Sequence, residues 1–507
     1  MSAGHKPEMG GRVCMPHVTT HSKRAEIIDP REIRRSAARG AIFVAGRQVV
    51  VQGINVLGTV LLTRALSTYE FGFYAILVFA SQATSLLSGT ALALQAVRSP
   101  IPLSTRALRV LFTAQLALAA SGCLILWVGA PEIARAYHAR QEITTSLRLI
   151  ALAVLLSCLQ TIPTALMERN LQFGRLAVAE ISRALSFNVV AVGAAYAGWG
   201  IQGVSLGILV RVIVGAATVN CLKRWKFGLA FDLITLKSEL GSGVAYLGAA
   251  AVSVIKDSIT PVFMGLLLGA ADVGLVSWAT RVASYCVIAL MMLQRLYIPT
   301  FSRMASHPRE LSGFVTSVLK ITNSVAAPAA CLILAFIRPI TINVFGDKWL
   351  SAIPVFYLFW GANLIVPTVT PLVSLLQALN RGRIAFYLAV MWMLLTWILG
   401  IPAIWCLGIL GAGLANLLVQ FSNYIVLRIV RQHISIRVLP NVLPFWIIAL
   451  VAAGMMRIGA VFVPPESLRS TIIYLIMGGL LYLIGVWLIK RRDVRSIASL
   501  MKQSVAR

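Results

Sequence analysis

Charged residues are scarce in this chain, and their scarcity excludes a soluble fold. Of the 507 residues, 12% are Asp, Glu, Lys or Arg and 58% are hydrophobic, with a mean hydropathy of +0.84. A soluble domain of this length carries about twice that share of charge. The composition therefore predicts an all-α polytopic membrane protein, in which glycine and proline, present here 38 and 20 times, are common.

Paired cysteines and metal-binding clusters are also lacking. The seven cysteines are scattered, mostly within apolar runs, where they act as small packing residues. Cys14, His17 and His21 have a faintly metal-like spacing, but they lie in a polar N-terminal tail, where chance explains the spacing better than a site does. We predict no metal site and no cofactor other than a coupling ion, H⁺ or Na⁺.

Catalytic motifs are missing as well. The sequence has no Walker motif, no glycine-rich phosphate loop, and no HExxH or GxSxG in a suitable context. No loop on the outer side exceeds about 20 residues, whereas glycan polymerases, ligases and lipid-linked glycosyltransferases need room for an external catalytic loop or domain. We therefore predict that the protein is not an enzyme and does not hydrolyse ATP.

Apolar runs of about 20 residues, the length that crosses a hydrocarbon core of roughly 30 Å, follow one another from Ala41 onward. We expect the first run to act as an uncleaved insertion signal. We predict about fourteen transmembrane helices, at residues 41–62, 72–96, 107–129, 147–167, 177–197, 201–221, 241–267, 273–298, 316–337, 351–377, 384–406, 409–430, 441–463 and 470–489.

Basic residues outnumber acidic ones by 45 to 17, which gives a formal net charge of +28. They punctuate the apolar runs instead of forming a nucleic-acid-binding patch, so we predict no nucleic-acid partner. Their distribution alternates, with 31 in the two tails and every second loop and seven in the loops between. By the positive-inside rule, both termini face the cytoplasm.

An internal repeat links two hairpins 202 residues apart. TVLLTRALSTYEFGFYAI (59–76) aligns with PVFMGLLLGAADVGLVSW (261–278), so that Glu70 and Gly72 match Asp272 and Gly274. Each copy has a helix end, a short turn and an acidic-x-Gly start to the next helix. Six helices separate the copies, so both run the same way through the membrane, and this predicts two parallel-repeat lobes.

Five segments of the chain form recognisable motifs, in the order TRALSTYEFGFYA (63–75), ALMERNLQFGRLA (165–177), LLLGAADVGLVSWATRVA (266–283), YIPTFSRM (297–304) and VFGDKWLSAIPVF (344–356). Together they resemble Wzx-type oligosaccharide flippases, which are polysaccharide biosynthesis transporters of the multidrug/oligosaccharidyl-lipid/polysaccharide superfamily. The resemblance covers roughly residues 35–430, and the last two helices match only in hydropathy. The basic N-terminal tail is longer than expected for the family.

The resemblance implies a multi-pass protein of the bacterial inner membrane. It would move undecaprenyl-pyrophosphate-linked oligosaccharide units to the outer leaflet for O-antigen, exopolysaccharide or capsule biosynthesis, by rocking two bundles about a central cavity. Membrane lipid and the lipid-linked glycan are the implied partners, and the pathway's polymerase and chain-length proteins are candidates for further ones. We predict a cytoplasmic basic tail (1–38), an N-terminal lobe (39–221), a cytoplasmic linker (222–240), a C-terminal lobe (241–430), two extra helices (431–489) and a second cytoplasmic basic tail (490–507).

Several predicted membrane helices contain charges, which cost roughly 2.5–3.5 kcal/mol each on insertion scales and need a reason. Arg47, Arg211, Lys256 and Arg281 are candidates for the cationic lining of a cavity that binds an anionic substrate. A structural pairing is an equal alternative for Arg211. Asp257 follows Lys256, and because successive helical residues point about 100° apart the two need not pair. Asp257 is a candidate for ion coupling, with neutralisation through another helix as the alternative.

Polar residues in the first predicted helix form a stripe beside Arg47. Gln48, Gln52 and Asn55 are spaced at i, i+4 and i+7, which favours a face toward the bundle interior, although helix–helix hydrogen bonding explains the stripe equally well. Glu180 and Arg183, three residues apart on another helix, are expected to pair with each other.

The sign of the buried charge separates the candidate functions. An excess of cations suits a lipid pyrophosphate, whereas an exporter of organic cations needs the opposite sign. The alternatives that the sequence leaves open are a lipid II flippase for the peptidoglycan precursor, a cation-coupled drug antiporter of the same superfamily, and a non-transporting membrane scaffold.

Overall fold

Helices make up nearly all of the described structure. The computed structural model describes residues 30–87, 104–170, 172–232, 248–288, 290–305 and 307–489, and in these ranges it contains α-, π- and 3-10 helices but no strand. The predicted all-α fold is thus confirmed for these residues. The C-terminal tail, most of the N-terminal tail and part of the predicted linker lie outside them.

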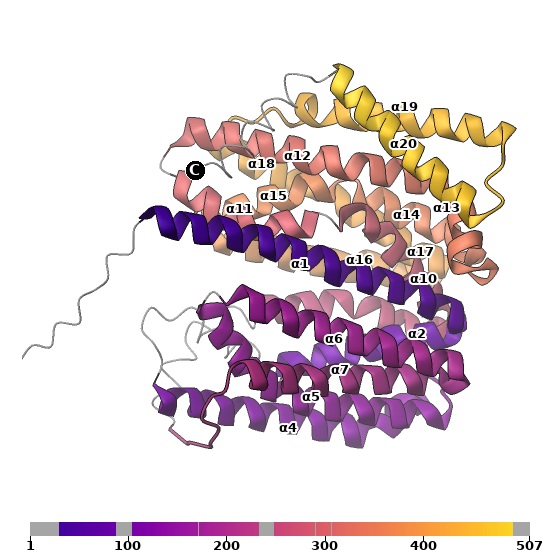
Figure 1. Cartoon of the computed structure of the whole chain (residues 1–507). Helices are drawn as coiled ribbons and strands as arrows, with labels where there is room; N and C mark the ends of the chain where they lie inside the picture. Colours follow the sequence, from indigo (N-terminus) through magenta and orange to yellow (C-terminus); the bar gives the residue numbers. More distant parts are fainter. Residues whose placement is uncertain are drawn as a thin grey trace, which may run out of the picture.

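The described helices between residues 30 and 222 form one group, which occupies the lower part of Figure 1 with α1 along its upper edge. Helix α1 packs on α6, and α4, α5, α6 and α7 pack on one another. The bounds are α1 (Pro30–Ala65), α2 (Thr68–Leu87), α4 (Thr105–Ala136), α5 (Gln141–Arg169), α6 (Phe173–Ala194), the π-helix η1 (Ala195–Trp199) and α7 (Gly200–Leu222).

The described helices between residues 248 and 489 form a second group, which occupies the upper part of Figure 1. It begins with a helix at residues 248–257, which continues into η2. Helices α19 and α20 pack against α12 at the outer face of this group. The bounds are η2 (Ile259–Met264), α9 (Gly265–Leu268), α10 (Ala270–Ser284), η3 (Tyr285–Val287), α11 (Leu290–Met304), α12 (Pro308–Ala335), α13 (Ile337–Ile340), η4 (Thr341–Phe345), η5 (Asp347–Ala352), α14 (Ile353–Asn363), α15 (Val366–Ala378), α16 (Gly382–Leu407), α17 (Ile409–Phe421), α18 (Asn423–His433), α19 (Val438–Phe462) and α20 (Leu468–Ile489).

Within the described residues, fewer than the predicted fourteen helices meet a test of length and hydropathy for membrane spans. Nine helices there are long and apolar enough to cross a membrane, and a pair bent by 42° between Asn363 and Val366 makes ten. This number treats Phe173–Leu222 as one helix. Gly198 and Gly200, with φ of 85° and 47°, break that stretch into α6 and α7, which lie side by side (Figure 1). The prediction of fourteen spans is therefore not confirmed.

Helix α1 begins earlier than predicted. Its first residue is Pro30, inside the segment predicted as a polar tail, and it continues for 36 residues to Ala65. Proline fits the first turn of a helix because the amide hydrogen that it lacks would have no partner there. Helical structure therefore extends well beyond the predicted apolar run 41–62, into the segment predicted as the cytoplasmic tail.

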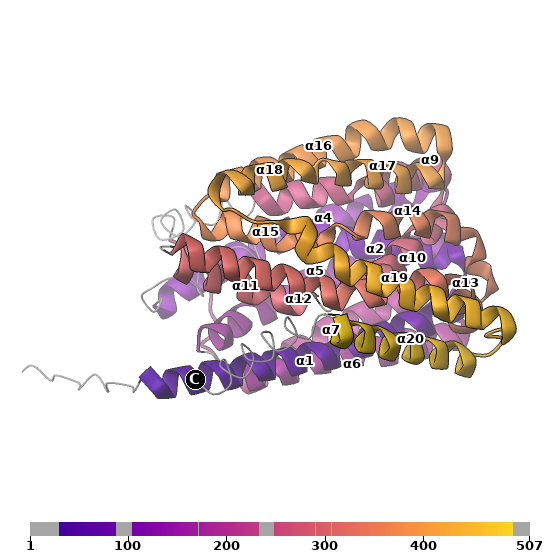
Figure 2. The same cartoon turned by 90° about the horizontal axis from the view of Figure 1, so that it is seen from above.

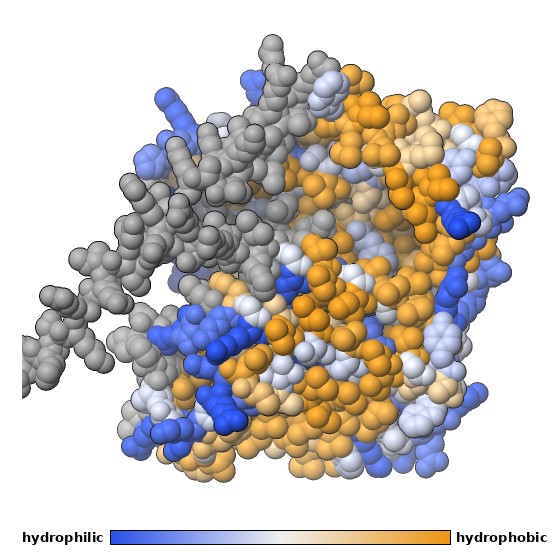
Figure 3. Space-filling view, viewed as in Figure 1, coloured by the Kyte–Doolittle hydropathy of each residue, from blue (hydrophilic) through white to orange (hydrophobic). Residues whose placement is uncertain are grey.

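A broad apolar surface covers the middle of the molecule. Figure 3 shows hydrophobic residues across the centre of one face and hydrophilic residues gathered toward its two ends. Exposed large apolar side chains are numerous on α19 and α20, among them Val461, Phe462, Leu483 and Ile489. This pattern, together with the apolar helices, defines a multi-pass membrane protein.

The two groups of helices meet at the end opposite the start of α1, called the far end below. Helix α2 of the first group packs along α10 of the second, near the middle of the molecule when it is seen from above (Figure 2). A Cβ atom added to Gly72 would lie 1.7 Å from the carbonyl oxygen of Ala270, and one added to Gly274 would lie 2.1 Å from that of Thr68. The two contacts are equivalent under the repeat offset of 202, which relates Gly72 to Gly274 and Thr68 to Ala270.

Reciprocal backbone capping strengthens this contact. The Lys348 ammonium donates to the carbonyl oxygens of Arg64 (2.9 Å) and Leu66, at the end of α1. In return, the Arg64 guanidinium donates to the carbonyl oxygens of Val344 (2.7 Å) and Asn343, at the end of η4. Helix C-termini leave carbonyl groups without intrahelical partners, and cations near them are favourable. Each group of helices thus caps a helix end of the other.

An aromatic cluster fills the space beside the caps. Trp278 stacks on Trp349 with ring centroids 5.8 Å apart, Phe71 meets Trp349 edge-on at 5.2 Å, and Phe345 meets Trp278 at 5.4 Å. The Trp349 indole also donates to the carbonyl oxygen of Thr63 (3.2 Å). Both tryptophans are at most 1% exposed. We call the reciprocal caps, the glycine contact and this cluster the far-end closure.

Candidate functional site

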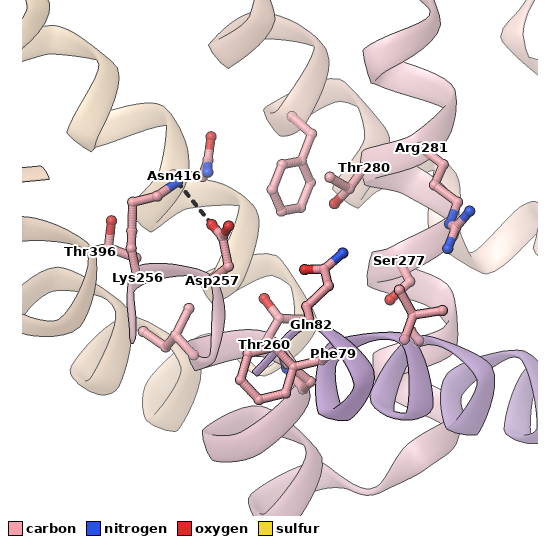
Figure 4. Close-up of a pocket in the computed structure, with 15 residues that line it drawn as sticks. Phe79, Gln82, Lys256, Asp257, Thr260, Ser277, Thr280, Arg281, Thr396 and Asn416 are labelled. Atoms are coloured by element: carbon pink, nitrogen blue, oxygen red, sulfur yellow. Dashed lines mark ion pairs between the residues drawn. The ribbon is translucent and has the colours of Figure 1, made fainter. Parts of the chain in front are cut away.

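A cavity of about 360 Å³ lies between the two groups of helices, next to the far-end closure along α2 and α10. Its walls come from α2 of the first group and from the 248–257 helix, η2, α10, α14, α16 and α17 of the second (Figure 4). The charged and polar residues that line this central cavity are Gln82, Lys256, Asp257, Thr260, Ser277, Thr280, Arg281, Thr396 and Asn416.

Lys256 and Asp257 form an ion pair at one side of the cavity. The Lys256 Nζ and Asp257 Oδ1 atoms are 2.9 Å apart, and their side chains are 40% and 57% exposed (Figure 4). The two side chains can meet because the regular helix ends at this point and passes into the wider π-helix η2. The Trp397 indole anchors the same turn by donating to the carbonyl oxygen of Ile255 (2.8 Å).

Arg281 lies on the other side of the cavity (Figure 4). Its guanidinium carbon sits 5.6 Å from the ring centre of Phe71 and 5.0 Å from that of Tyr74, both on α2. No carboxylate within the described ranges lies at ion-pair distance from it. Eleven residues of α10 precede Arg281, so the arginine lies roughly 16 Å along the helix axis from the start of α10. Aromatic faces hold this cation without neutralising it.

The charges that line the central cavity therefore do not cancel. Lys256 and Asp257 balance each other, and Arg281 leaves one positive charge. Gln82 on α2 and Thr280 on α10 add neutral hydrogen-bonding groups between the ion pair and the arginine (Figure 4). A low-dielectric cavity with an unpaired cation and neutral hydrogen-bonding groups is suited to an anionic group.

Arg47 lies outside the central cavity lining, in the first group of helices. Its Nε atom is 3.2 Å from the Glu180 carboxylate, and the Arg47 side chain is 4% exposed. The expected pair of Glu180 with Arg183 is therefore replaced by a pair between α1 and α6. Arg183 instead donates to the Ala179 carbonyl (3.2 Å) and to Gln160 (3.4 Å), and it stays within electrostatic range of Glu180, Arg47 and Arg211.

Arg211 and the polar stripe of α1 also lie away from the central cavity lining. Arg211 is an exposed residue of α7, near Arg183. Gln48, Gln52 and Asn55 are half-buried. The structure thus brings Lys256, Asp257 and Arg281 together, and it separates them from Arg47, Arg211 and the stripe.

Sequence reasoning missed the polar residues that complete the cavity walls. Asn416, Gln420 and Asn423 occupy positions i, i+4 and i+7 across the α17–α18 junction, the same spacing that drew attention to the stripe of α1. That spacing was the signal that could have found them. Gln82 is an isolated polar residue in an apolar run, and nothing in the sequence relates it to Arg281.

A tyrosine holds the π-helix of the cavity wall from the first group. The Tyr137 hydroxyl, just beyond the end of α4, donates to the carbonyl oxygen of Pro261 in η2 (2.7 Å). Burial raises the pKa of Tyr137 to about 12, so the hydroxyl keeps its proton at neutral pH. Pro261 thus lies in a π-helix, and its carbonyl oxygen accepts a hydrogen bond from the first group of helices.

Two helical groups around a cavity with a mid-depth cation define the fold of a membrane transporter, and solved structures share it. The chain is similar to the lipid II flippase MurJ in an inward closed conformation, with a TM-score of 0.67, 14% identity, and coverage of 90% of this chain and 98% of that one. It is also similar to an inward-facing multidrug resistance MATE family transporter of the MOP superfamily, with a TM-score of 0.59 and 13% identity over 77% of this chain and 98% of the other. At these identities the likeness concerns the fold alone.

The family model described as "Polysaccharide biosynthesis protein" matches residues 61–354, more than half of the chain. The chain belongs to this family, and the predicted resemblance to Wzx-type flippases is confirmed. Its members are membrane transporters and not enzymes.

Curated relatives agree with this family. The chain is 23% identical over 402 residues to the lipopolysaccharide biosynthesis protein WzxC of Escherichia coli, covering 78% of this chain and 80% of that protein. It is 25% identical over 339 residues to the succinoglycan biosynthesis transport protein ExoT of Rhizobium meliloti, covering 66% and 68%. It is 22% identical over 272 residues to the teichuronic acid biosynthesis protein TuaB of Bacillus subtilis, covering 52% of this chain and 55% of that protein.

Proposed function

We propose that the protein is a flippase of the bacterial inner membrane. It moves undecaprenyl-pyrophosphate-linked oligosaccharide units from the cytoplasmic to the outer leaflet for O-antigen, exopolysaccharide or capsule biosynthesis. Family membership and the names of WzxC, ExoT and TuaB support a polysaccharide pathway. The pathway's polymerase and chain-length proteins are candidate partners.

Arg281 is the observation that carries this proposal. A pyrophosphate linked to a lipid is a compact anion that must cross the apolar interior, and it needs a fixed cation at that depth. Arg281 is such a cation, held by the faces of Phe71 and Tyr74. Because both rings belong to α2 and the arginine to α10, a ligand on Arg281 touches the seam between the two groups of helices.

Alternating access is the mechanism that we propose. With the far end closed, the central cavity accepts the pyrophosphate and sugar head from the cytoplasmic side, while the polyprenyl tail stays in lipid. Rocking of the two groups then opens the far end and releases the head outside. The bend of 42° between α14 and α15, with Pro367 in the first turn of α15, gives the second group a place to flex.

Ion coupling is proposed for the Lys256–Asp257 pair. A proton or Na⁺ that reached the Asp257 carboxylate would compete with the Lys256 ammonium, now 2.9 Å away. The freed ammonium would then turn to the pyrophosphate and add a second cation to the cavity. The substrate and the ion would in this way favour the same conformation.

Rival functions make different demands on the cavity. An exporter of organic cations needs an unpaired carboxylate, whereas Asp257, the only carboxylate among the described residues that line the central cavity, is already paired. A lipid II flippase carries a pyrophosphate too, so the cavity charge does not separate it from the proposal. Deleting the gene does so, because loss of the cell wall follows in one case and loss of a surface glycan in the other.

The experiment compares Arg281→Ala and Arg281→Lys in a deletion strain of the source bacterium. We expect Arg281→Ala to lower surface glycan at least about tenfold and to accumulate lipid-linked units on the cytoplasmic side, because the fixed cation is lost. Arg281→Lys keeps the charge but loses the planar group that stacks on aromatic rings, so partial export is expected.

Arg457→Ala is the matched control, because Arg457 is an exposed arginine of α19 outside the cavity lining. Protein amount in the membrane is measured for every variant. Normal export by Arg281→Ala at normal protein level would overturn the proposal. Export that survives removal of Arg281, Lys256 and Asp257 together would favour a scaffold.

A further inference from the structure

A second, smaller cavity adjoins the central one within the second group of helices. It has a volume of about 160 Å³, and it shares Lys256, Thr396 and Asn416 with the central cavity. Its other walls come from α15, α16, α17 and α18. We call it the amide cavity, because Asn416, Gln420 and Asn423 give it three carboxamide side chains.

The three carboxamides lie on one face of two consecutive helices. Asn416 and Gln420 are four residues apart on α17, and Asn423 is the first residue of α18, after a break at Ser422. Positions i, i+4 and i+7 of a helix share one side. Burying three amides in an apolar membrane helix costs free energy unless they form hydrogen bonds with one another or with a ligand.

One of the two polar side-chain atoms of Asn423 has no hydrogen-bond partner among the described residues. Asn423 is 5% exposed, and its Nδ2 atom donates to Gln420 Oε1 at 2.6 Å. Its Oδ1 atom is buried and has no hydrogen-bond partner in the described part of the chain. A buried polar group without a partner points to a missing donor in the cavity.

An aromatic wall accompanies the amides. The Trp392 ring lines the amide cavity, and its indole nitrogen donates to the Ser422 hydroxyl (3.1 Å), which in turn donates to the Val419 carbonyl (2.6 Å). These bonds fix the ring. Carboxamides that bond hydroxyl groups, beside an aromatic face that packs on C–H groups, match the two kinds of surface of a sugar ring.

The amide cavity is poorly suited to a small cation. Among the described residues, its lining includes the Lys256 ammonium, which repels a cation, and no carboxylate of the kind that holds Ca²⁺. Its volume corresponds to about five water molecules at roughly 30 Å³ each, which is the size class of one monosaccharide and too small for an oligosaccharide.

We propose that the amide cavity is a saccharide subsite, which binds the sugar attached directly to the pyrophosphate. This rests on the proposed function, in which the pyrophosphate lies in the central cavity near Arg281. Lys256 lines both cavities and lies at the junction between the pyrophosphate and the sugar. The hydroxyl or N-acetyl hydrogen of that sugar is the donor that Asn423 Oδ1 lacks.

The test measures dissociation constants for the full-length protein in lipid nanodiscs. The probes are undecaprenyl pyrophosphate without sugar, and the same lipid carrying one glucose, one galactose or one N-acetylglucosamine. We expect at least one sugar-bearing probe to bind about tenfold more tightly than the bare lipid pyrophosphate, since one or two added hydrogen bonds contribute a factor of that order.

Three variants test whether the amide cavity is responsible for the tighter binding of the sugar-bearing probes. Asn423→Ala and Gln420→Ala should bring the ratio between the sugar-bearing and bare probes close to one, and should leave the affinity for undecaprenyl pyrophosphate unchanged. Asn220→Ala is the matched control, because Asn220 is a membrane asparagine of α7 whose amide donates to the Leu159 and Ala216 carbonyls. If Asn423→Ala does not fold, Gln420→Ala, a half-buried position, decides.

The outcomes separate the subsite from the function. Failure to bind any probe would overturn the proposed function. Equal binding of all probes by the unaltered protein, or a sugar-dependent gain that survives both Asn423→Ala and Gln420→Ala, would overturn the subsite alone. A ratio that these variants leave unchanged, while they alter the effect of Na⁺ on binding, would assign the cavity to a cation instead.

Discussion

Some of the charged side chains at membrane depth form local ion pairs instead of lining the central cavity. The sequence places Arg47, Arg211, Lys256 and Arg281 at membrane depth, and helical periodicity gives the face of each. It does not give the neighbour, since Glu180 reaches Arg47 across two helices. The sequence therefore could not predict how many cations line the central cavity, although Lys256 and Arg281 are two of the four candidates and do line it.

The arginines near Glu180 make its loss more costly than the loss of Arg47. Arg47, Arg183 and Arg211 lie near one another, and Glu180 is the carboxylate that contacts Arg47. Glu180→Gln leaves repelling cations at membrane depth, whereas Arg47→Met leaves Glu180 with Arg183 close by. We expect Glu180→Gln to destabilise by about 3 kcal/mol, the lower end for a broken buried pair, and Arg47→Met by clearly less.

Thermal unfolding in detergent measures this difference. The double variant Arg47→Met with Glu180→Gln should recover part of the loss, because it removes one cation together with the carboxylate. A larger loss for Arg47→Met than for Glu180→Gln would contradict the ordering.

Among the elements, the predicted spans agree best with the structure where a run is uniformly apolar. The predicted 384–406, 441–463 and 470–489 correspond to Gly382–Leu407, Val438–Phe462 and Leu468–Ile489. The single span predicted at 351–377 is divided into α14 and α15 by a bend, which a hydropathy pattern does not reveal. The capping box at the start of α2, in which Ser67 Oγ accepts from Glu70 N (3.2 Å) and Glu70 Oε2 from Ser67 N (2.8 Å), was readable from Ser-x-x-Glu.

The glycine contact at the far end makes a prediction for α2 and α10. A Cβ at Gly274 would lie 2.1 Å from the Thr68 carbonyl oxygen, which belongs to the backbone and cannot rotate away. Gly274→Ala must therefore push α2 and α10 apart, and we expect it to lower export several-fold and to destabilise the closed form by about 1–3 kcal/mol.

Gly454→Ala is the control for this substitution, because nothing lies within 4 Å of an added Cβ in α19. It should stabilise slightly, by up to about 1 kcal/mol, since alanine is the better helix former. Surface glycan and thermal unfolding are measured for both. Equal behaviour of the two variants would show that the close approach at Gly274 is not required.

The reciprocal caps make a prediction about the conformational equilibrium. Lys348→Met removes the donor to the Arg64 and Leu66 carbonyls, and so should favour opening of the far end. A cation at a helix C-terminus contributes about 1 kcal/mol, which corresponds to roughly a fivefold shift in the population of the open form.

A cysteine in the cavity reports this shift. Ser277→Cys, in a cysteine-free background, should react roughly fivefold faster with a membrane-impermeant maleimide in intact cells when Lys348→Met is present. Arg338→Met, which removes a nearby exposed arginine that takes no part in the closure, should leave the rate unchanged. An unchanged rate in Lys348→Met would mean that the caps do not hold the far end shut.

At the scale of the whole molecule, the charge pattern of the loops predicts an orientation that labelling can test. Glu466 lies between α19 and α20, in a loop predicted to face outward, and Arg383 lies at the start of α16, at a turn predicted to face the cytoplasm. In a cysteine-free background, an impermeant maleimide should label Glu466→Cys in intact cells and Arg383→Cys only after permeabilisation. The reverse pattern would invert the molecule and place the closed end of the cavity inside.

The three sequence segments TRALSTYEFGFYA, LLLGAADVGLVSWATRVA and VFGDKWLSAIPVF lie far apart in the chain, yet all of them contribute to the far-end closure. Order and spacing along the chain were sufficient to associate them with a family. Their meeting in space could not be predicted, because it depends on how the two repeats face each other.

The aromatic cluster of the closure gives the opening step a thermal signature. Phe71, Trp278 and Trp349 are buried in this structure, and in the proposed alternating-access cycle they would meet water when the far end opens. Newly wetted apolar surface raises the heat capacity of the open form. In the proposed cycle the free-energy difference between the closed and open forms would therefore vary nonlinearly with temperature, so that warming or cooling changes how often the cavity faces outward, even with the substrate supply held constant.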